Sequence, residues 1–403
     1  MQTKRKFVLI LGAGQTGLSA INYLNKKNFK IFDTRNFNNL PENIKNNPLI
    51  EENLISEDSI NIKLIDYVIC SPGFDLTHQL IKKLNEQNIS IKSDIEVFIE
   101  NTDSKIILVT GTNGKTTISL LLEKFISLKG FSSKAIGNIG NPVLNFVDTH
   151  KDYFVIEVSS FHLDISDNLK SDLSILLNIS EDHLDRHKSF ENYKHIKNSI
   201  FNNSKISIGN KDDENIKKGL TEYFNGDTNI DTANLNAVKV VLDNIGINFS
   251  FEELEKHKFK PEHRMEIFYK DKLNRVFIND SKATNCGATL AAINSLKGEK
   301  KFFLICGGQS KGADFSKLAE EIKKNCYGVI IYGEDKNLIF DELSDFNKLT
   351  TDSFEEAISL CLKVSKPDSK VLFSPACASF DMFKNFEDRG NKFKELILNE
   401  RNS

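Results

Sequence analysis

A lysine and several threonines and glycines stand together where the chain leaves an apolar strand. The segment TGTNGKTT (residues 110–117) lies between the apolar run Lys105–Val109 and an apolar helical stretch, Ile118–Leu128. Backbone N–H groups in such a loop cradle phosphates, the lysine reaches the β and γ oxygens, and the next hydroxyl holds Mg²⁺. Val109 stands where the common pattern has its first glycine. The segment predicts phosphate contacts by Gly111, Thr112, Asn113, Gly114, Lys115, Thr116 and Thr117.

A carboxylate and an imidazole follow on two further strands of the same predicted sheet. Glu157 lies in the apolar strand Tyr153–Val158, where a carboxylate is costly unless it is paired or bound to a metal. His183 comes just after the strand Leu173–Ile179. Taken singly, each is better explained as a structural polar residue. As a set beside a phosphate loop, Thr116, Glu157 and His183 favour a Mg²⁺ site, because carboxyl ends of parallel strands meet at one edge.

A glycine motif follows the first apolar strand, Phe7–Leu11. Glycines stand at 12, 14 and 17, and Asp33 ends the next strand, Lys30–Phe32. This pattern fits a dinucleotide fingerprint, in which glycines allow close approach of the backbone to a diphosphate. It does not separate NAD from a UDP-sugar, and a glycine turn that only packs a helix on a sheet is the alternative.

Lysines and hydroxyls gather at three strand ends in the last third of the chain. The polar segments are 280–285, 307–314 and 374–381, after the strands Val276–Asn279, Lys301–Cys306 and Lys370–Phe373. Such groups at one sheet edge suit an anionic ligand, such as the carboxylate of an amino acid. Solvated surface loops would give the same composition, so the residues alone leave both interpretations open.

The elements that carry these residues alternate between short strands and helices, which predicts α/β domains with mostly parallel sheets. A length of 403 residues is too great for one ordinary core. We expect a Rossmann-like domain at 1–92, a phosphate-loop ATPase-like domain at 93–260 and a second Rossmann-like domain at 261–403. The polar stretch 202–231 lacks strong periodicity and is expected to form surface loops and short elements.

The bulk composition is that of a soluble globular protein, with 39% hydrophobic and 27% charged residues. A net charge of −3 gives no reason to expect a nucleic-acid or membrane partner. No run approaches the roughly 18 apolar residues of a membrane span. The six cysteines form no C-x-x-C pair and are expected to be reduced thiols, so we predict a cytoplasmic protein.

At these motifs the sequence resembles the Mur ligases of peptidoglycan synthesis, over nearly the whole chain. The matching segments, in family order, are TGTNGKTT (110–117), GNIGNP (137–142), EVSSFHLD (157–164), NISEDHLDRH (178–187), HR (263–264), NDSKATN (279–285), GGQSKGADF (307–315) and SPACASFDMF (374–383). The last three, with the Ser-Pro-Gly turn at Ser71, resemble the family members that add D-glutamate.

The resemblance implies ATP-dependent addition of D-glutamate to UDP-N-acetylmuramoyl-L-alanine through an acyl phosphate, with ATP and two Mg²⁺ ions as cofactors. Lys115, His183, Lys197 and Lys282 would be the catalytic residues. Thr116, Glu157, His183 and a carbamylated Lys197 would hold the metal ions. The nucleotide would also contact Asn236, Arg264 and Asp280. The family's usual His-Asn pair near Asn236 is Thr232-Ala233 here, a departure at the position expected to contact the adenine.

The same resemblance assigns the two other substrates. Residues around the UDP-muramoyl substrate would be Gly14, Gln15, Thr16, Asp33, Thr34, Arg35, Ser71, Gly73, Asn138 and Ser159. Residues around D-glutamate would be Thr284, Lys311, Ser379, Phe380 and Phe386, besides Lys282. A monomer is expected.

Four other functions compete. Another Mur ligase or a folylpolyglutamate-type ligase would share the phosphate loop, although the latter leaves the N-terminal block unexplained. A nicotinamide dehydrogenase would explain the first glycine motif but would leave Lys115, Glu157 and His183 without a role. A nucleotide-gated binding protein would keep ATP without turnover.

Overall fold

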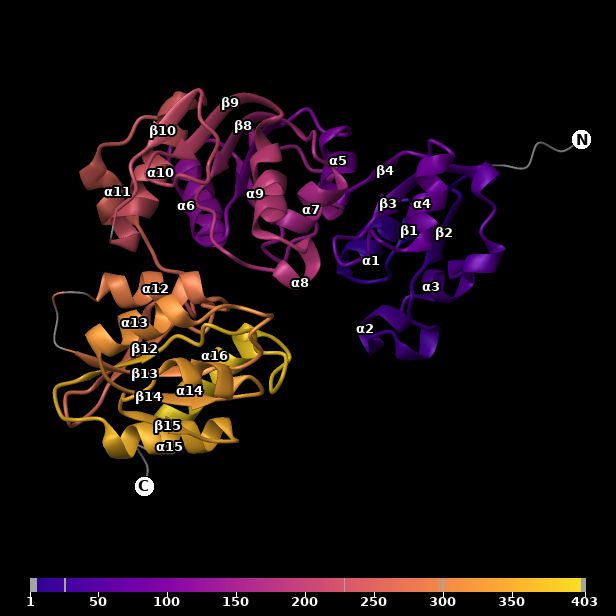
Figure 1. Ribbon diagram of the computed structural model, residues 1–403. Helices are drawn as coiled ribbons and strands as arrows, with labels where there is room; N and C mark the ends of the chain where they lie inside the picture. Colours follow the sequence, from indigo (N-terminus) through magenta and orange to yellow (C-terminus); the bar gives the residue numbers. More distant parts are fainter. Residues whose placement is uncertain (1–5, 25–26, 228, 297, 299–300, 400–403) are drawn as a thin grey trace, which may run out of the picture. The chain divides into compact units, whose positions relative to one another are not determined.

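The computed structural model describes residues 6–24, 27–227, 229–296, 298 and 301–399. They form three β-sheets with accompanying helices, which confirms the predicted α/β class (Figure 1). By their contacts the residues fall into two compact units, one up to 179 with 194–224 and 237–251, the other of 180–193, 225–236 and from 252 onward. No helix in these ranges is long and apolar enough to cross a membrane.

The first sheet lies in the first unit and has the order β2-β1-β3-β4, all parallel. Its strands are β1 (Phe7–Leu11), β2 (Phe29–Phe32), β3 (Ile65–Cys70) and β4 (Ile91–Lys92). Its helices are α1 (Gln15–Tyr23), α2 (Glu42–Lys45), α3 (Pro48–Asn53) and α4 (Gln79–Glu86). Every residue of β1 is buried, as the continuous apolar run predicts for a central parallel strand.

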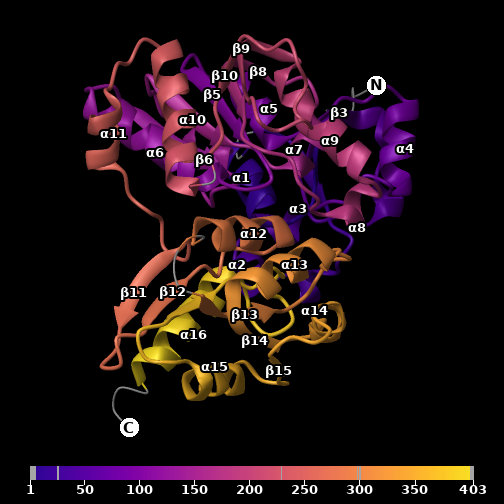
Figure 2. The same cartoon turned by 60° about the vertical axis from the view of Figure 1, so that its left-hand side comes forward.

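The second sheet, also in the first unit, has the order β10-β9-β8-β5-β7-β6 and is parallel throughout. Its strands are β5 (Lys105–Thr110), β6 (Ser133–Gly137), β7 (Tyr153–Glu157), β8 (Lys170–Leu176), β9 (Asn203–Asn210) and β10 (Glu222–Phe224). Helices α5 (Asp94–Ile99), α6 (Lys115–Leu128) and α7 (Ser160–Ile165) belong to this unit. Helix α6 packs against β5, β6 and β7 (Figure 2).

Strand β9 corrects one expectation. Residues 202–231 were expected to form surface loops and short elements, yet β9 runs for eight residues and pairs with β8 and β10. Its polar residues alternate with Ile206 and Ile208, and Ile208 is fully buried. A strand next to the sheet edge needs only one apolar position in two, and asparagine, serine and lysine masked this short alternation.

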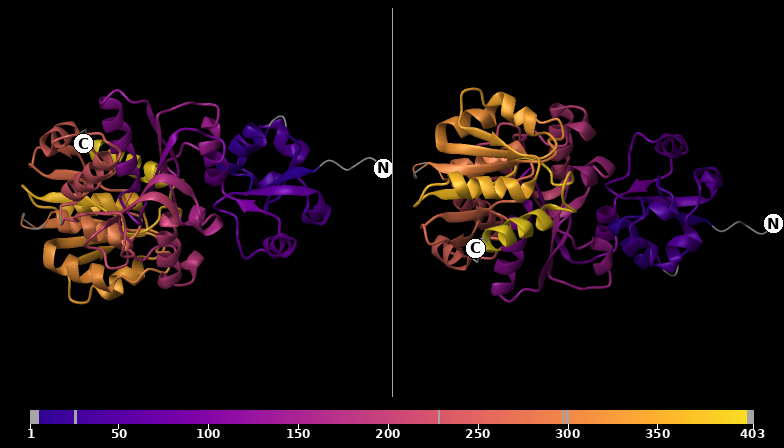
Figure 3. Two further views of the ribbon diagram at one scale, coloured as in Figure 1. Left: turned by 90° about the horizontal axis from the view of Figure 1, so that it is seen from above. Right: turned by 90° about the horizontal axis from the view of Figure 1, so that it is seen from below.

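The third sheet lies in the second unit, with the order β11-β12-β16-β13-β14-β15. Its strands are β11 (Glu266–Lys270), β12 (Val276–Asn279), β13 (Phe302–Gly307), β14 (Cys326–Tyr332), β15 (Lys348–Thr350) and β16 (Lys370–Phe373). Only β11 is antiparallel to its neighbour. In Figure 3 its orange and yellow strands run side by side in both views.

Two helical layers cover this third sheet. Its helices are α12 (Cys286–Ser295), α13 (Ser316–Asn325), α14 (Lys336–Glu342), α15 (Phe354–Val364) and α16 (Phe386–Asn399). Leu304 on β13 packs in a cluster with α12, α13 and α14, whereas its neighbours Phe303 and Ile305 pack with α15 and α16. Successive side chains of a strand point to opposite faces, so a continuous apolar strand needs cover on both sides.

The middle of the chain contains further helices. They are α9 (Phe190–Asn198), α10 (Ile230–Asn244) and α11 (Phe251–His257), and the short helix α8 (Leu184–His187) precedes them.

Candidate active site

The predicted phosphate loop leaves β5 and enters α6, as the order of strand, glycine loop and helix requires. Gly114 caps the helix with a φ of 86°, in the left-handed region that glycine adopts without strain. Helix α6 then begins at Lys115, so its first N–H groups point into the loop. The Nζ atom of Lys115 lies 2.7 Å from the carbonyl oxygen of Gly111 and 2.8 Å from that of Thr112. The lysine therefore lies across its own loop.

Asn178, which sequence reasoning did not select, ties this loop to the segment after β8. Its Oδ1 accepts a hydrogen bond from the backbone N–H of Asn113 at 2.8 Å, and its Nδ2 donates to the Asn113 carbonyl at 3.1 Å. The backbone carbonyl of Asn178 also accepts from the Thr112 N–H at 2.9 Å. Three hydrogen bonds thus hold the loop in shape. In the sequence, Asn178 lies near a strand end and opens the matching segment 178–187, but no role was assigned to it.

Glu157 is the buried carboxylate of this sheet edge, with 2% of its surface exposed. It ends β7, in register with Val109 of β5 and Gly137 of β6. Its Oε2 accepts from the Thr116 hydroxyl at 2.8 Å, and its Oε1 accepts from Nδ2 of Asn138 at 2.8 Å. The structure therefore brings three predicted site residues together: Thr116, Glu157 and Asn138.

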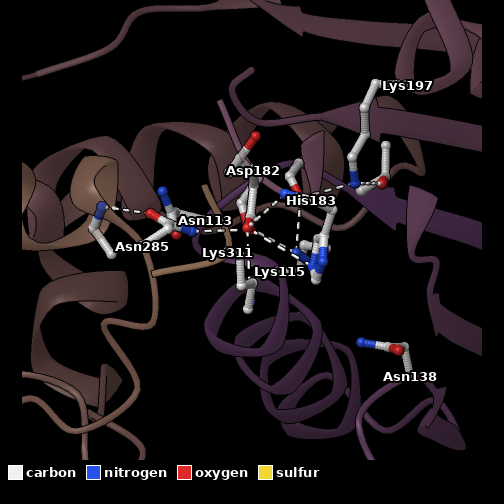
Figure 4. Close-up of polar contacts among 12 residues, drawn as sticks. Asn113, Lys115, Asn138, Asp182, His183, Lys197, Asn285 and Lys311 are labelled. Atoms are coloured by element: carbon white, nitrogen blue, oxygen red, sulfur yellow. Dashed lines mark hydrogen bonds and ion pairs between the residues drawn. The ribbon is translucent and has the colours of Figure 1, made fainter. Parts of the chain in front are cut away.

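Lys197 is buried beneath the same loop, with 1% exposure. Its Nζ donates to Oγ1 of Thr110 at 2.9 Å and to the Gly111 carbonyl at 3.0 Å (Figure 4). Burying a lysine is costly, so its position this close to a phosphate loop indicates a role beyond packing. Its assignment as a carbamylated metal ligand stays a prediction.

A divalent cation fits the oxygen donors at this edge. Mg²⁺ is bound in proteins by one or two carboxylates together with waters and phosphate oxygens. Glu157 and the Thr116 hydroxyl supply that kind of partial set, and their oxygens lie 2.8 Å apart. In the described ranges no three histidine, cysteine or acidic side chains form a closed cage. A cation here would therefore share its coordination with a nucleotide.

His183, the remaining predicted ligand, belongs to the second unit. It has a φ of 53°, and its backbone N–H donates to Oδ1 of Asp182 at 3.0 Å. Its Nε2 lies 3.8 Å from the other carboxylate oxygen of Asp182. Its role beside Glu157 stays a prediction.

In the first sheet, Asp33 and Ser71 hold the glycine turn from the two strands that flank β1. Asp33 Oδ2 accepts from the Ala13 N–H at 2.6 Å, and Ser71 Oγ donates to the Gly12 carbonyl at 3.1 Å. A Cβ on Gly17 would lie 2.1 Å from the Gly12 carbonyl oxygen, so only glycine fits there. The turn is preformed, and Gly14 caps α1 behind it.

Asp33 also binds Arg35 through three hydrogen bonds of 2.9 Å. Burial would raise the pKa of the Asp33 carboxyl, but the hydrogen bonds from Arg35 and Ala13 outweigh it and hold the pKa below its usual range. The carboxylate is thus ionised and already occupied by protein donors. The other predicted UDP contacts line this edge as exposed or half-buried residues: Gln15, Thr16, Thr34, Arg35 and Gly73.

Asp280 lies at the carboxyl end of β12 and is buried. Its Oδ2 accepts from the Ser374 hydroxyl at 2.8 Å, and its Oδ1 accepts from the Met265 N–H at 3.1 Å. Burial raises the pKa of Asp280 to about 7, against the opposing effects of Ser374, Met265 and the Arg264 charge. Arg264 stands between two residues of positive φ, His263 at 60° and Met265 at 46°. Such backbone is held only where the surrounding structure requires it.

Five of the six residues predicted for the amino acid substrate lie on loops that follow strands β12, β13 and β16, and the sixth, Phe386, begins α16. Nζ of Lys282 is 3.8 Å from the ring centre of Phe386. Lys311 Nζ is 3.8 Å from Oδ1 of Asp182, whose Oδ2 accepts from Nδ2 of Asn285 at 3.0 Å (Figure 4). Asp182 is thus an acidic group beside Lys311 and Asn285.

The other predicted contacts differ in exposure. Ser379 is buried at 2%, whereas its neighbour Phe380 is 68% exposed. Thr284 is half-buried. Asn236, predicted to contact the nucleotide, donates from Nδ2 to the Asn225 carbonyl at 3.0 Å. The contacts predicted for these residues with the amino acid and the nucleotide stay predictions.

Arg389 on α16 is a second residue that sequence reasoning missed. It is fully buried and joins two of the loops that are predicted to contact the amino acid. Its Nη2 and Nε donate to the carbonyl and hydroxyl oxygens of Ser281, at 2.8 and 3.1 Å, and its Nη1 donates to the Cys377 carbonyl at 3.0 Å. Because Ser281 adjoins Lys282 and Cys377 lies two residues before Ser379, the guanidinium fixes the spacing of the two loops. An arginine in an amphipathic helix gives no sequence signal of burial.

The amino-acid sequence is similar to those of known proteins along nearly the whole chain. The UDP-N-acetylmuramoylalanine–D-glutamate ligase of Coxiella burnetii is 35% identical, over 98% of this chain and 99% of the relative. The ligase of the same name from Francisella philomiragia is 35% identical, over 97% and 96%. The chain belongs to the Mur ligase family. Three family models match this Mur ligase: the MurD-like N-terminal domain at 6–93, the middle domain at 109–270 and the glutamate ligase domain at 263–377.

Solved structures of distant relatives agree on the fold of this Mur ligase. MurF of Thermotoga maritima, in complex with ADP, has a TM-score of 0.62 at 16% identity and covers 98% of each chain. Escherichia coli FolC in complex with ADP has a TM-score of 0.59 at 14% identity, over 83% of this chain and all of the other. The resemblance inferred from the motifs is thus confirmed.

Proposed function

We propose that this Mur ligase adds D-glutamate to UDP-N-acetylmuramoyl-L-alanine, with ATP converted to ADP and phosphate. The observation that carries the proposal is the identity of about one third along the whole chain to ligases of that name. A phosphate loop alone would also suit a folylpolyglutamate-type ligase or another Mur ligase. The match over residues 6–93 to a MurD-like N-terminal domain favours a UDP-linked substrate over a folate.

The first step would activate the substrate carboxylate. Its oxygen attacks the γ-phosphorus of ATP and ADP leaves, which gives an acyl phosphate. Lys115 and the N–H groups of the loop would neutralise and align the phosphates as charge moves to the leaving ADP. Thr116 and Glu157 are the residues that would hold Mg²⁺, an ion that neutralises phosphate charge in such transfers. Asn138, whose Nδ2 donates to Glu157, would contact the UDP-muramoyl substrate.

The second step would form the amide bond. The amine of D-glutamate attacks the acyl carbon and loses a proton, and the tetrahedral intermediate expels phosphate. Lys282 and Lys311 are suited to bind the carboxylates of the amino acid, and Asp182 is suited to bind its ammonium. Phe386 lies against Lys282 and restricts where that lysine points. Buried Ser379 offers a further hydroxyl, and the roles of Thr284 and Phe380 rest on the resemblance.

Lys197 would act as a carbamate in this scheme. Carbon dioxide adds to the neutral amine and a proton leaves, so a cationic side chain becomes an anionic oxygen ligand for a second Mg²⁺. The contacts of Nζ with Thr110 and Gly111 put it at the base of the phosphate loop, which supports the proposal.

Phosphate release from ATP tests the function directly. UDP-N-acetylmuramoyl-L-alanine is supplied with D-glutamate, L-glutamate, meso-diaminopimelate or D-alanyl-D-alanine. We expect release that depends on both the UDP substrate and D-glutamate. Release with another acceptor would move the assignment to another Mur ligase, and ATP binding without release under any condition would favour a nucleotide-gated binding protein.

A further inference from the structure

Helix α7 begins at a serine whose hydroxyl also contacts a buried histidine. Ser159 caps the helix, and its Oγ accepts from the backbone N–H of His162 at 3.3 Å. The same oxygen lies 2.6 Å from Nδ1 of the His162 ring. Ser159 is half-buried, whereas His162 is 3% exposed. A serine cap needs only the backbone contact, so the ring adds a separate restraint on the hydroxyl.

The other ring nitrogen of His162 faces a buried carboxylate on α5. Nε2 lies 3.5 Å from Oδ1 of Asp94, and both side chains are almost fully buried. Within the described part of the chain, this oxygen of Asp94 accepts no hydrogen bond of normal geometry. A buried carboxylate oxygen is costly without compensation, and Nε2 of His162 is the ring atom that faces it.

Burial favours the neutral form of the His162 ring, whereas burial and nearby donors act on the Asp94 carboxyl in opposite directions. Burial lowers the pKa of His162; the Asp94 and Glu157 charges oppose this, and the Lys197 charge adds to it. Burial raises the pKa of Asp94, opposed by His162 and by the backbone N–H groups of Asp94 and Ile95. Asp94 is also the first residue of α5, where the helix N-terminus favours a negative charge. A carboxylate facing Nε2 selects the tautomer with its proton on that nitrogen.

We propose that Asp94 and His162 are positioning residues that turn the Ser159 hydroxyl so that Oγ offers a lone pair, and not its proton, to the UDP-muramoyl substrate. With the ring proton on Nε2, Nδ1 is an acceptor, and the Ser159 hydroxyl donates its hydrogen bond to it. The remaining lone pair then accepts only from an N–H or O–H group, such as an amide or a sugar hydroxyl. This inference rests on the proposed contact between Ser159 and that substrate.

The opposite end of α7 provides a matched control. The Ser166 hydroxyl accepts from the backbone N–H of Ser93 at 2.9 Å and donates to the carboxylate of Glu96. This contact also joins α7 to the start of α5, but it does not involve Ser159. Ser166→Ala therefore loosens the same two helices without changing the direction of the Ser159 hydroxyl.

The experiment compares KM values for UDP-N-acetylmuramoyl-L-alanine, ATP and D-glutamate in the full-length enzyme. For His162→Leu we expect the first KM to rise roughly three- to tenfold, as for one lost hydrogen bond, with the other two unchanged. Asp94→Asn keeps the shape but turns an amide N–H toward Nε2, which moves the ring proton to Nδ1. It should raise the same KM, and it serves as the second variant should His162→Leu fail to fold. Ser166→Ala should leave all three KM values unchanged.

A double-mutant cycle separates this role from simple packing. If His162 acts through Ser159, His162→Leu raises the KM in the wild-type background and has no further effect in Ser159→Ala. An equal rise in both backgrounds, or an unchanged KM in Ser159→Ala, would overturn the inference. Calorimetric Kd values for the UDP substrate, without ATP or D-glutamate, give the same comparison independently of turnover. A failure of the proposed ligase activity is thus a separate result.

Discussion

Replacing Asn178 by alanine tests how far ATP affinity depends on a side chain outside the phosphate loop. The substitution removes the two side-chain hydrogen bonds to Asn113, of 2.8 and 3.1 Å. Each hydrogen bond contributes about 0.5–1.5 kcal/mol net, so the ordered conformation of the loop becomes less stable by about 1–3 kcal/mol. ATP would have to restore that order on binding, which raises the KM for ATP roughly 5- to 150-fold. The KM for D-glutamate should stay within about twofold, because its contacts lie on other loops.

The assay is phosphate release at varied ATP with both other substrates saturating. Asn210→Ala is the matched control, since the Asn210 amide donates to the Leu177 carbonyl at 3.3 Å and not to the loop. It should leave the KM for ATP unchanged. An unchanged KM for ATP in Asn178→Ala, with a lowered melting temperature, would refute the reasoning and leave Asn178 a purely structural residue.

Three further predictions concern pH, packing and the buried lysine. Asp280 has its pKa raised to about 7, so its favourable contribution to folding is complete below about pH 4 and is lost as pH rises through 7. In urea unfolding, the free energy of unfolding of wild type should fall between pH 5 and pH 8, whereas that of Asp280→Asn should not fall for this reason. An equal change with pH in both proteins would contradict this. Gly17→Ala puts a Cβ 2.1 Å from the Gly12 carbonyl oxygen. Overpacking of this kind costs about 1–3 kcal/mol, so the melting temperature should fall by several degrees. An unchanged melting curve would show that the turn can move. Lys197→Ala should lose activity that formate or acetate partly restores, because a short carboxylate can replace the carbamate, and no rescue at any concentration would count against that role.

The strands were the most predictable part of the fold, because their signal is local. The apolar runs at Phe7–Leu11, Val276–Asn279 and Lys370–Phe373 have the bounds of β1, β12 and β16. A buried parallel strand is apolar at nearly every position, and a glycine or small polar turn marks its end. Strand β9 was missed for the converse reason, since polar residues interrupt its short alternation.

The candidate site was predictable where its chemistry is carried by one short segment. The phosphate loop has its glycines and lysine in one run, and Glu157 was conspicuous as a charge inside an apolar strand. Asn178 and Arg389 were not predictable, because each acts through hydrogen bonds to backbone atoms distant in the chain. Neither residue type signals burial, and a single sequence does not show which strand ends become neighbours.

The position of Lys115 has a consequence for how ATP enters. The Lys115 ammonium already donates to two carbonyl oxygens of the loop. The phosphates of ATP must therefore compete with these carbonyl oxygens for the lysine. Measured affinity is then an exchange free energy, in which new hydrogen bonds to phosphate oxygens replace the existing ones to the loop carbonyls. The arrangement weakens binding to some degree but gives a loop that keeps its shape when empty, and it favours ready departure of ADP after each turnover.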